Sequence, residues 1–89
     1  MTLRLLNIEF NHVVYDEPRD VLYLSVNEPV EAADSVQTPE GHVIRYDNGG
    51  AIIGITLVNA KWLTEKNGSL DVTPPAEHIA REHLEAAFA

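Results

Sequence analysis

The sequence predicts an α+β domain, an antiparallel β-meander sheet accompanied by one short helix and a C-terminal helix. Two observations carry this prediction. Residues 15–26 and 46–58 begin alike, each with a Tyr-Asp pair, a polar turn and then an apolar run of β character. Turn-forming Pro, Gly, Asn and Asp residues also separate a series of short segments in which apolar and polar residues alternate. Such spacing is typical of hairpins in series.

Length and composition limit what the domain can be. The 89 residues, of which 45% are apolar, predict a single domain over 1–89. A chain of this length buries only about 60–65% of its unfolded surface, so self-association is a plausible supplement to its stability. The net charge of -8 repels phosphate backbones and anionic headgroups, so we expect no nucleic-acid and no membrane partner.

Cysteine is absent, which excludes disulfides and thiolate metal sites. No apolar run reaches the length of a signal-peptide core followed by small residues, and none approaches the roughly 20 residues of a membrane span. We therefore expect a cytoplasmic protein.

The first half of the chain predicts short strands. Residues 1–15 alternate well enough for one or two strands, broken near Asn11. Pro18 and its acidic neighbours predict a tight reversal, after which residues 21–26 form a strand. A turn at 27–29 leads to a weak, polar strand over 30–38, whose low apolar content favours an edge position.

The most apolar strand is predicted at residues 51–58, after a strand at 42–46 and the glycine turn at 47–50. Alternation would put Ile53 on one face of this strand and Ile52 on the other, and both faces look buried. A strand with two apolar faces is typical of the centre of a sheet. Gly54, in mid-strand, predicts a bulge or a close approach of another group.

Two interpretations compete after Asn59. Asn67-Gly68 is a hairpin turn signal, but residues 60–66 are good helical material. We favour the helix, with Asn59 as its N-cap and Gly68 in the left-handed position that ends it. A short strand at 69–73 and a C-terminal helix over about 74–88, with an apolar stripe, complete the prediction.

The two stretches that begin alike also match the sequence pattern of a known family. Tyr15-Asp16 through Val26, and residues 41–60 with Gly49-Gly50 and Gly54, resemble a small uncharacterised prokaryotic family, domain of unknown function 2283. The similarity covers roughly residues 12 to 66. It implies a β-meander and no established activity. Thr56 departs from the family pattern, in which an acidic residue is frequent at that position.

The residue pattern offers little chemistry. His12 and His42 lie on predicted strands and could form an acid-base pair with each other or with Asp16, but no nucleophile pattern accompanies them. His78 and His83 are five residues apart and do not share a helix face. The acidic turns lack the spacing of a calcium loop. We therefore expect no metal, no cofactor and no catalysis.

The leading hypothesis is a protein interaction or homo-oligomerisation module, most simply a homodimer, with a protein partner as the other possibility. Its interface would use aromatic and apolar side chains that a short chain cannot cover by itself, namely Tyr23, Ile52, Val58 and Trp62. One alternative is a small-ligand-binding domain with a pocket near Tyr23, Trp62 and Phe88. Another is a hydrolase that depends on His12 or His42.

Overall fold

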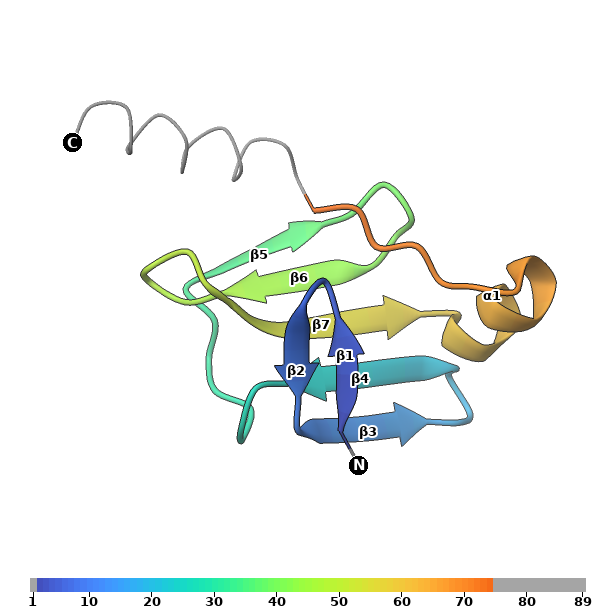
Figure 1. Ribbon diagram of the computed structural model, residues 1–89, viewed down its shortest axis with the longest axis horizontal. Helices are drawn as coiled ribbons and strands as arrows, with labels where there is room; N and C mark the ends of the chain where they lie inside the picture. The colour runs from blue at the N-terminus through green and yellow to red at the C-terminus, as the bar shows by residue number, and fades with distance from the viewer. Residues whose placement is uncertain (1, 75–89) are drawn as a thin grey trace.

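A computed structural model describes residues 2–74 of the protein (Figure 1). The fold class is confirmed, because antiparallel strands make up most of the described chain and one helix accompanies them. The elements are β1 (Leu3–Leu5), β2 (Ile8–Phe10), β3 (His12–Asp16), β4 (Val21–Ser25), β5 (Asp34–Gln37), β6 (Val43–Tyr46), β7 (Ile52–Val58) and α1 (Ala60–Asn67).

The N-terminal region holds more strands than the sequence predicted. β1 and β2 form a separate two-stranded sheet, and the expected break at Asn11 leads into β3. The β1–β2 hairpin reverses through Leu6 and Asn7, whose φ angles of 54° and 61° are both positive. Two positive φ angles are typical of a type I′ turn, which matches the twist of the paired strands. Leu6 is an unusual residue there, but its side chain packs against the core.

The main sheet has five strands in the order β3-β4-β7-β6-β5, all antiparallel. A simple meander would keep the strands in sequence order, whereas here β7 lies between β4 and β6. From β4 to β7 the order is that of a Greek key, with the long connection 26–33 carrying the chain to the far edge. The central position of the most apolar strand and the edge position of β5 are both as predicted, although β5 is shorter than expected.

A bulge in β7 changes which residues face the core. Arg45 pairs with Gly54 but Tyr46 pairs with Ile52, so Ile53 is an extra residue in the ladder. Strict alternation would put Ile52 on the face opposite Ile55 and Leu57. Because of the extra residue, Ile52 packs against the core with them. The predicted division of β7 into two faces is therefore wrong at its first residue.

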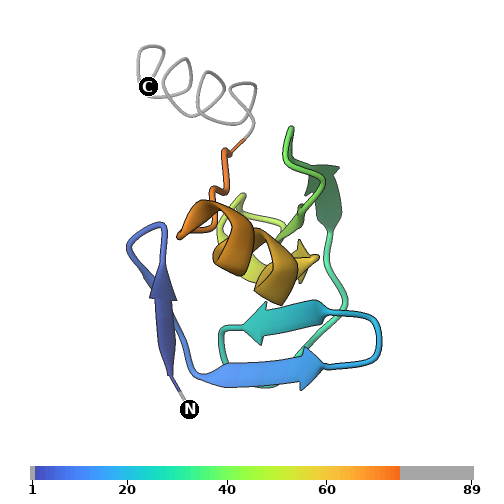
Figure 2. The same cartoon turned by 90° about the vertical axis from the view of Figure 1, so that its right-hand side faces the viewer.

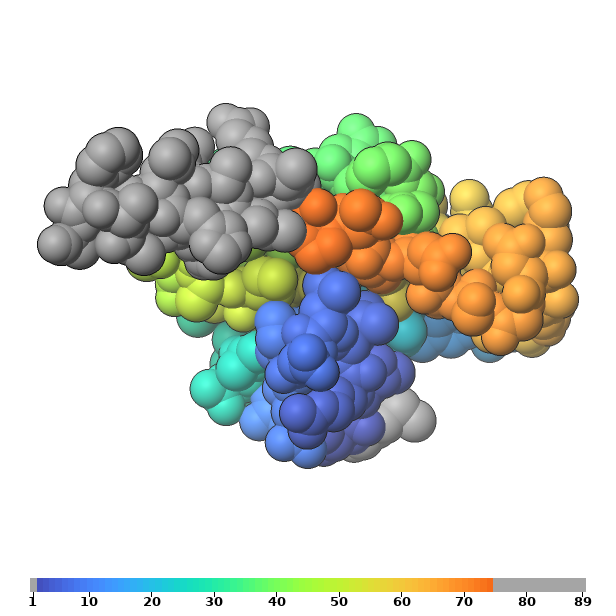
Figure 3. Space-filling view, turned by 45° about the horizontal axis from the view of Figure 1, so that its top comes forward, coloured from blue at the N-terminus to red at the C-terminus, as the bar shows by residue number. Residues whose placement is uncertain are grey.

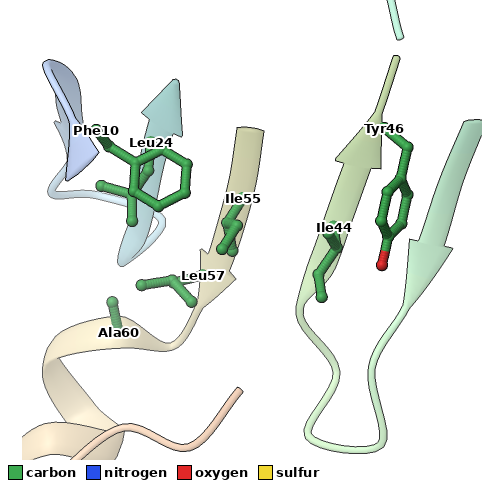
Figure 4. Packing of buried hydrophobic residues seen from close by; sticks show 7 residues of the cluster. All are labelled: Phe10, Leu24, Ile44, Tyr46, Ile55, Leu57 and Ala60. Carbon is green, nitrogen blue, oxygen red and sulfur yellow. The ribbon is translucent and has the colours of Figure 1, made fainter. Parts of the chain in front are cut away.

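The core lies on one side of the five-stranded sheet, which we call the inner face. Its buried hydrophobic residues come from both sheets and from the start of α1: Phe10, Leu24, Ile44, Tyr46, Ile55, Leu57 and Ala60 (Figure 4). The β1–β2 hairpin stands on this side of the sheet (Figure 2), and the space-filling view shows the hairpin and the segment before residue 74 lying over it (Figure 3). The inner face is thus covered by the chain itself.

Helix α1 confirms the helical interpretation of residues 60–66. Gly68 ends it in the left-handed conformation, φ 76°, and its N–H donates to the carbonyl of Thr64 at 2.8 Å. Asn59 occupies the N-cap position but makes no side-chain cap bond. The carboxylate of Asp20 replaces it, accepting hydrogen bonds from the backbone N–H groups of Lys61 and Trp62 at 2.8 and 3.0 Å.

The segment after α1 is extended but is not a strand, contrary to the prediction for 69–73. Leu70 and Val72 pack on the core, and the Glu40 carboxylate accepts hydrogen bonds from the N–H and Oγ1 of Thr73 at 3.1 and 2.5 Å. These contacts replace the ladder that a strand would have needed. The C-terminal helix predicted over 74–88 lies beyond Pro74, outside the described residues.

Candidate functional site

The second side of the five-stranded sheet, which we call the outer face, is defined by the strand register. Side chains that pair across the ladder lie on the same side, so the outer face can be read from the pairs that include Tyr23, Gly54 and Arg45. Its residues are His12, Val14, Asp16, Val21, Tyr23, Ser25, Ser35, Gln37, Val43, Arg45, Gly54, Thr56 and Val58.

Acidic residues are nearly absent from the outer face. The whole chain has 14 Asp and Glu, but the outer face has only Asp16, at its corner. The Asp16 carboxylate accepts a hydrogen bond from the Arg19 guanidinium at 3.1 Å, so its charge is compensated. The outer face thus carries one carboxylate, and that carboxylate is paired. Depletion of charged residues is typical of the centre of protein interfaces.

Apolar side chains are exposed on the part of the outer face formed by β3 and β4. Val14 and Tyr23 are directly opposite one another on β3 and β4, and 49% and 39% of their surfaces are exposed. Val58, which flanks Val21 on the same face, is half-buried. None of these side chains belongs to the core cluster on the inner face. The outer face therefore presents apolar surface that the described chain leaves uncovered.

An arginine lies across the centre of this face. The Arg45 guanidinium rests on Gly54, where a Cβ atom would overlap Nη2 and come within 2.8 Å of Cζ. The Gly54 predicted to mark a bulge or a close approach thus does both. Nη2 donates to Ser25 Oγ at 3.3 Å, but Nε is covered and has no hydrogen-bond partner. A buried donor without a partner costs about 1–3 kcal/mol.

The Arg45 side chain forms the floor of a shallow hollow of about 340 Å³. Its lining residues, all but Pro29 from the outer face, are His12, Val14, Tyr23, Ser25, Pro29, Arg45 and Thr56. No acidic side chain lines this hollow, and within residues 2–74 no carboxylate lies within ion-pair distance of Arg45. The guanidinium therefore has no counter-ion of its own in the described chain.

The four residues predicted to form an interface are not on one surface. Tyr23 and Val58 are both on the outer face, but Ile52 packs against the core because of the bulge. Trp62 lies on α1 with 54% of its surface exposed, and the Lys66 ammonium stands 4.6 Å from its ring centroid. Trp62 does not line the hollow that Tyr23 lines, and Phe88, the third residue of the alternative ligand pocket, lies outside the described residues.

The two strand histidines are separated rather than paired. His12 is on the outer face opposite Ser25, near the first residues of β7, while His42 is buried near the end of β7. The Nδ1 of His42 accepts a hydrogen bond from the Val58 N–H at 3.0 Å, and its Nε2 has no partner in the described chain. Burial lowers the pKa of His42. These environments do not bring the two histidines together as an acid-base pair.

Other candidate features are structural. The Asp47 carboxylate accepts from the N–H groups of Gly49 and Ala51 at 2.9 Å, so this acidic turn satisfies its own backbone. Among residues 2–74, no three His, Asp or Glu side chains gather as a metal-ligand set. No helix in this part of the chain has the length and apolarity of a membrane span.

Sequence reasoning missed Arg45, the residue at the centre of the face. Tyr23 was identifiable as an aromatic side chain in a β segment. Arg45 was not, because its position above Gly54 follows from the pairing of β6 with β7 and from the bulge beside it. The available signals were the mid-strand glycine and the lone basic residue of the 42–46 segment.

Comparison with known proteins gives a family and nothing beyond it. Neither the search of curated proteins nor the search of solved structures found a match. A family model described as Protein of unknown function (DUF2283) matches residues 12–61, which include β3 to β7 and the first residues of α1. The β1–β2 hairpin precedes the matched segment. Since the match covers more than half of the chain, this protein belongs to the DUF2283 family of proteins of unknown function.

Proposed function

We propose that this protein is an interaction module that pairs with a second copy of itself through the outer face of the five-stranded sheet. The observation that carries the proposal is the composition of that face. It combines exposed apolar side chains with a single, paired carboxylate, in a chain that has 14 acidic residues. Two copies of a chain of net charge -8 repel one another, and the repulsion is least when the surfaces that meet carry few carboxylates.

The energetics favour a modest affinity. Burying an apolar side chain such as Val14 or Tyr23 contributes about 1.5–3 kcal/mol before the cost of ordering the interface is subtracted. Five strands about 4.8 Å apart, each about five residues long, present roughly 400 Å² of projected sheet per chain. Since this is small for a stable interface, we expect a dimer that dissociates in the micromolar range.

Sedimentation equilibrium from about 1 to about 300 µM tests the proposal, because a dimer of this affinity dissociates within that range. We expect Tyr23→Ser and Val14→Lys each to raise the dissociation constant at least about tenfold, because each removes buried apolar contact and the second also brings like charges together. Trp62→Ser is the matched control, since Trp62 is an exposed aromatic residue outside the outer face. A wild-type protein that stays monomeric throughout would refute self-association, and a dimer lost only in Trp62→Ser would move the interface to α1.

A further inference from the structure

We infer that the hollow around Arg45 is a binding site for the carboxylate group of a small organic acid that has an apolar or aromatic body. This inference goes beyond self-association and does not need it, because the hollow exists in a single chain. Its basis is the juxtaposition of apolar walls with a guanidinium that has no carboxylate partner among residues 2–74.

The first step concerns the charge. Arg45 is largely covered by its neighbours, and its one hydrogen bond within the described chain is the 3.3 Å contact from Nη2 to Ser25 Oγ. A guanidinium has five N–H donors arranged in a fork that fits a carboxylate with two parallel hydrogen bonds. Nε is covered and Nη2 donates once to Ser25, so the donors left for a ligand are those of Nη1 and the second N–H of Nη2, in a partly desolvated position where pairing with an anion is strong.

The second step concerns the surroundings. The hollow of about 340 Å³ is within the size range of small-molecule sites. Val14, Tyr23 and Pro29 provide apolar walls, while Ser25 and Thr56 add hydroxyl groups near the guanidinium. Such a lining suits a ligand with one charged end and one apolar end.

The third step decides between anions. A phosphate group is usually held by several cations or by a row of backbone N–H groups. Arg45 is the only Lys or Arg among the lining residues, and the chain as a whole carries a net charge of -8, which repels polyanions. One guanidinium beside apolar walls matches a monocarboxylate better than a phosphate or a nucleic acid.

The test is an NMR titration of the amide resonances with sodium benzoate at constant ionic strength. We expect saturable shifts confined to the residues that line the hollow, with a dissociation constant of about a millimolar. Benzamide, which keeps the ring but has no charge, should bind at least about tenfold more weakly. Sodium chloride at the same ionic strength is the reference for non-specific effects.

Variants separate the guanidinium from charge in general. Arg45→Gln should weaken benzoate binding at least about tenfold, whereas Arg4→Gln, which removes the same charge from the exposed centre of β1, should leave it unchanged. Thr56→Glu supplies a second route if Arg45→Gln fails to fold, because its carboxylate would occupy the hollow and exclude benzoate. Equal binding of benzoate and benzamide, or undiminished binding to both hollow variants, would overturn the inference.

The proposed dimer would cover this hollow, because Val14 and Tyr23 line it and also lie in the proposed interface. Benzoate should therefore raise the dissociation constant of the dimer if both proposals hold. Benzoate binding by a protein that sediments as a monomer at all concentrations would retain the carboxylate site and refute self-association. A protein that dimerises but binds no benzoate at concentrations where it is monomeric would retain the dimer and overturn the carboxylate site.

Discussion

At the scale of single residues, the position of the Arg45 side chain explains why glycine occupies position 54. A side chain at position 54 would occupy the space of the Arg45 guanidinium, so only glycine lets the arginine lie flat on β7. Gly54 is not among the residues with positive φ, so conformational freedom is not what position 54 requires. The requirement is the space above its Cα atom.

Gly54→Ala tests this pair. The new methyl group should push the Arg45 guanidinium out of the hollow and lower the free energy of unfolding by about 1 kcal/mol, measured by urea denaturation. The same change in an Arg45→Ala background should be neutral or slightly stabilising, because alanine reduces the entropy of the unfolded chain and meets no guanidinium.

The double-mutant cycle isolates the contact between the two positions. A coupling free energy close to zero, with Gly54→Ala costing the same in both backgrounds, would show that glycine is needed at position 54 for another reason.

At the scale of elements, the start of α1 is held by a carboxylate that is distant in sequence. Asp20, in the β3–β4 turn, accepts hydrogen bonds from the first turn of α1 and from the hydroxyl of Tyr15 at 2.8 Å. The first of these contacts, with the backbone of Lys61, is the main cause of the lowered pKa of Asp20. The negative charge also lies at the positive end of the helix.

Asp20→Ala should release both partners at once. We expect the amide protons of Lys61 and Trp62 to exchange at least about tenfold faster, because they lose their acceptor. The hydrogen bond to Asp20 is the main cause that raises the pKa of Tyr15 to about 12, so in this variant that pKa should move back toward 10.0. Absorbance titration of the tyrosines measures this second effect.

Asp16→Ala is the matched control, since Asp16 leads into the same turn but its carboxylate contacts Arg19. Unchanged exchange at Lys61 and Trp62 in the Asp20 variant would mean that α1 is held by its packing and not by this cap.

At the scale of the whole molecule, residues 2–74 cover one side of the five-stranded sheet and leave apolar surface exposed on the other. Hydrophobic residues of the hairpin, of α1 and of the segment 68–74 all pack on the inner face. The same face buries His42, and Glu40 nearby holds Thr73. The coverage of the core should therefore respond to pH through these two groups.

Both groups make the protein less stable as the pH falls, but they act in different pH ranges. His42 has its pKa lowered from 6.5 by burial, so the unfolded chain takes up a proton first and stability falls as the pH drops below about 6.5. The hydrogen bonds from Thr73, the side-chain bond first, lower the pKa of Glu40 from 4.5 to about 2. Its contribution is present above pH 4.5 and is lost as the pH falls toward about 2.

Urea denaturation across pH measures both effects by comparison with variants. His42→Asn keeps an acceptor for the Val58 N–H without a titrating group, so the wild-type protein should lose stability relative to it between about pH 7 and about pH 5. Glu40→Gln should remove a separate part of the dependence below pH 4.5. Parallel stability curves for wild type and His42→Asn would contradict a lowered pKa for the buried histidine.

What the sequence determined by itself was local. Pro18, Gly50 and Gly68 specify reversals through backbone conformations that few other residues adopt, and residues 51–58 identify the central strand by apolar content alone. These features depend on neighbours in the chain, so a sequence contains them directly.

Only the tertiary structure decided how these pieces meet. Two features join residues that are distant in sequence: β7 lies beside β4, and Asp20 caps α1. Two others depend on strand register: the bulge moves Ile52 to the core, and Arg45 lies over Gly54. Alternation gives the period of a strand but not its register, and a shift of one residue exchanges the two faces. The inner and outer faces of this sheet, and with them the candidate site, therefore had to be read from the fold.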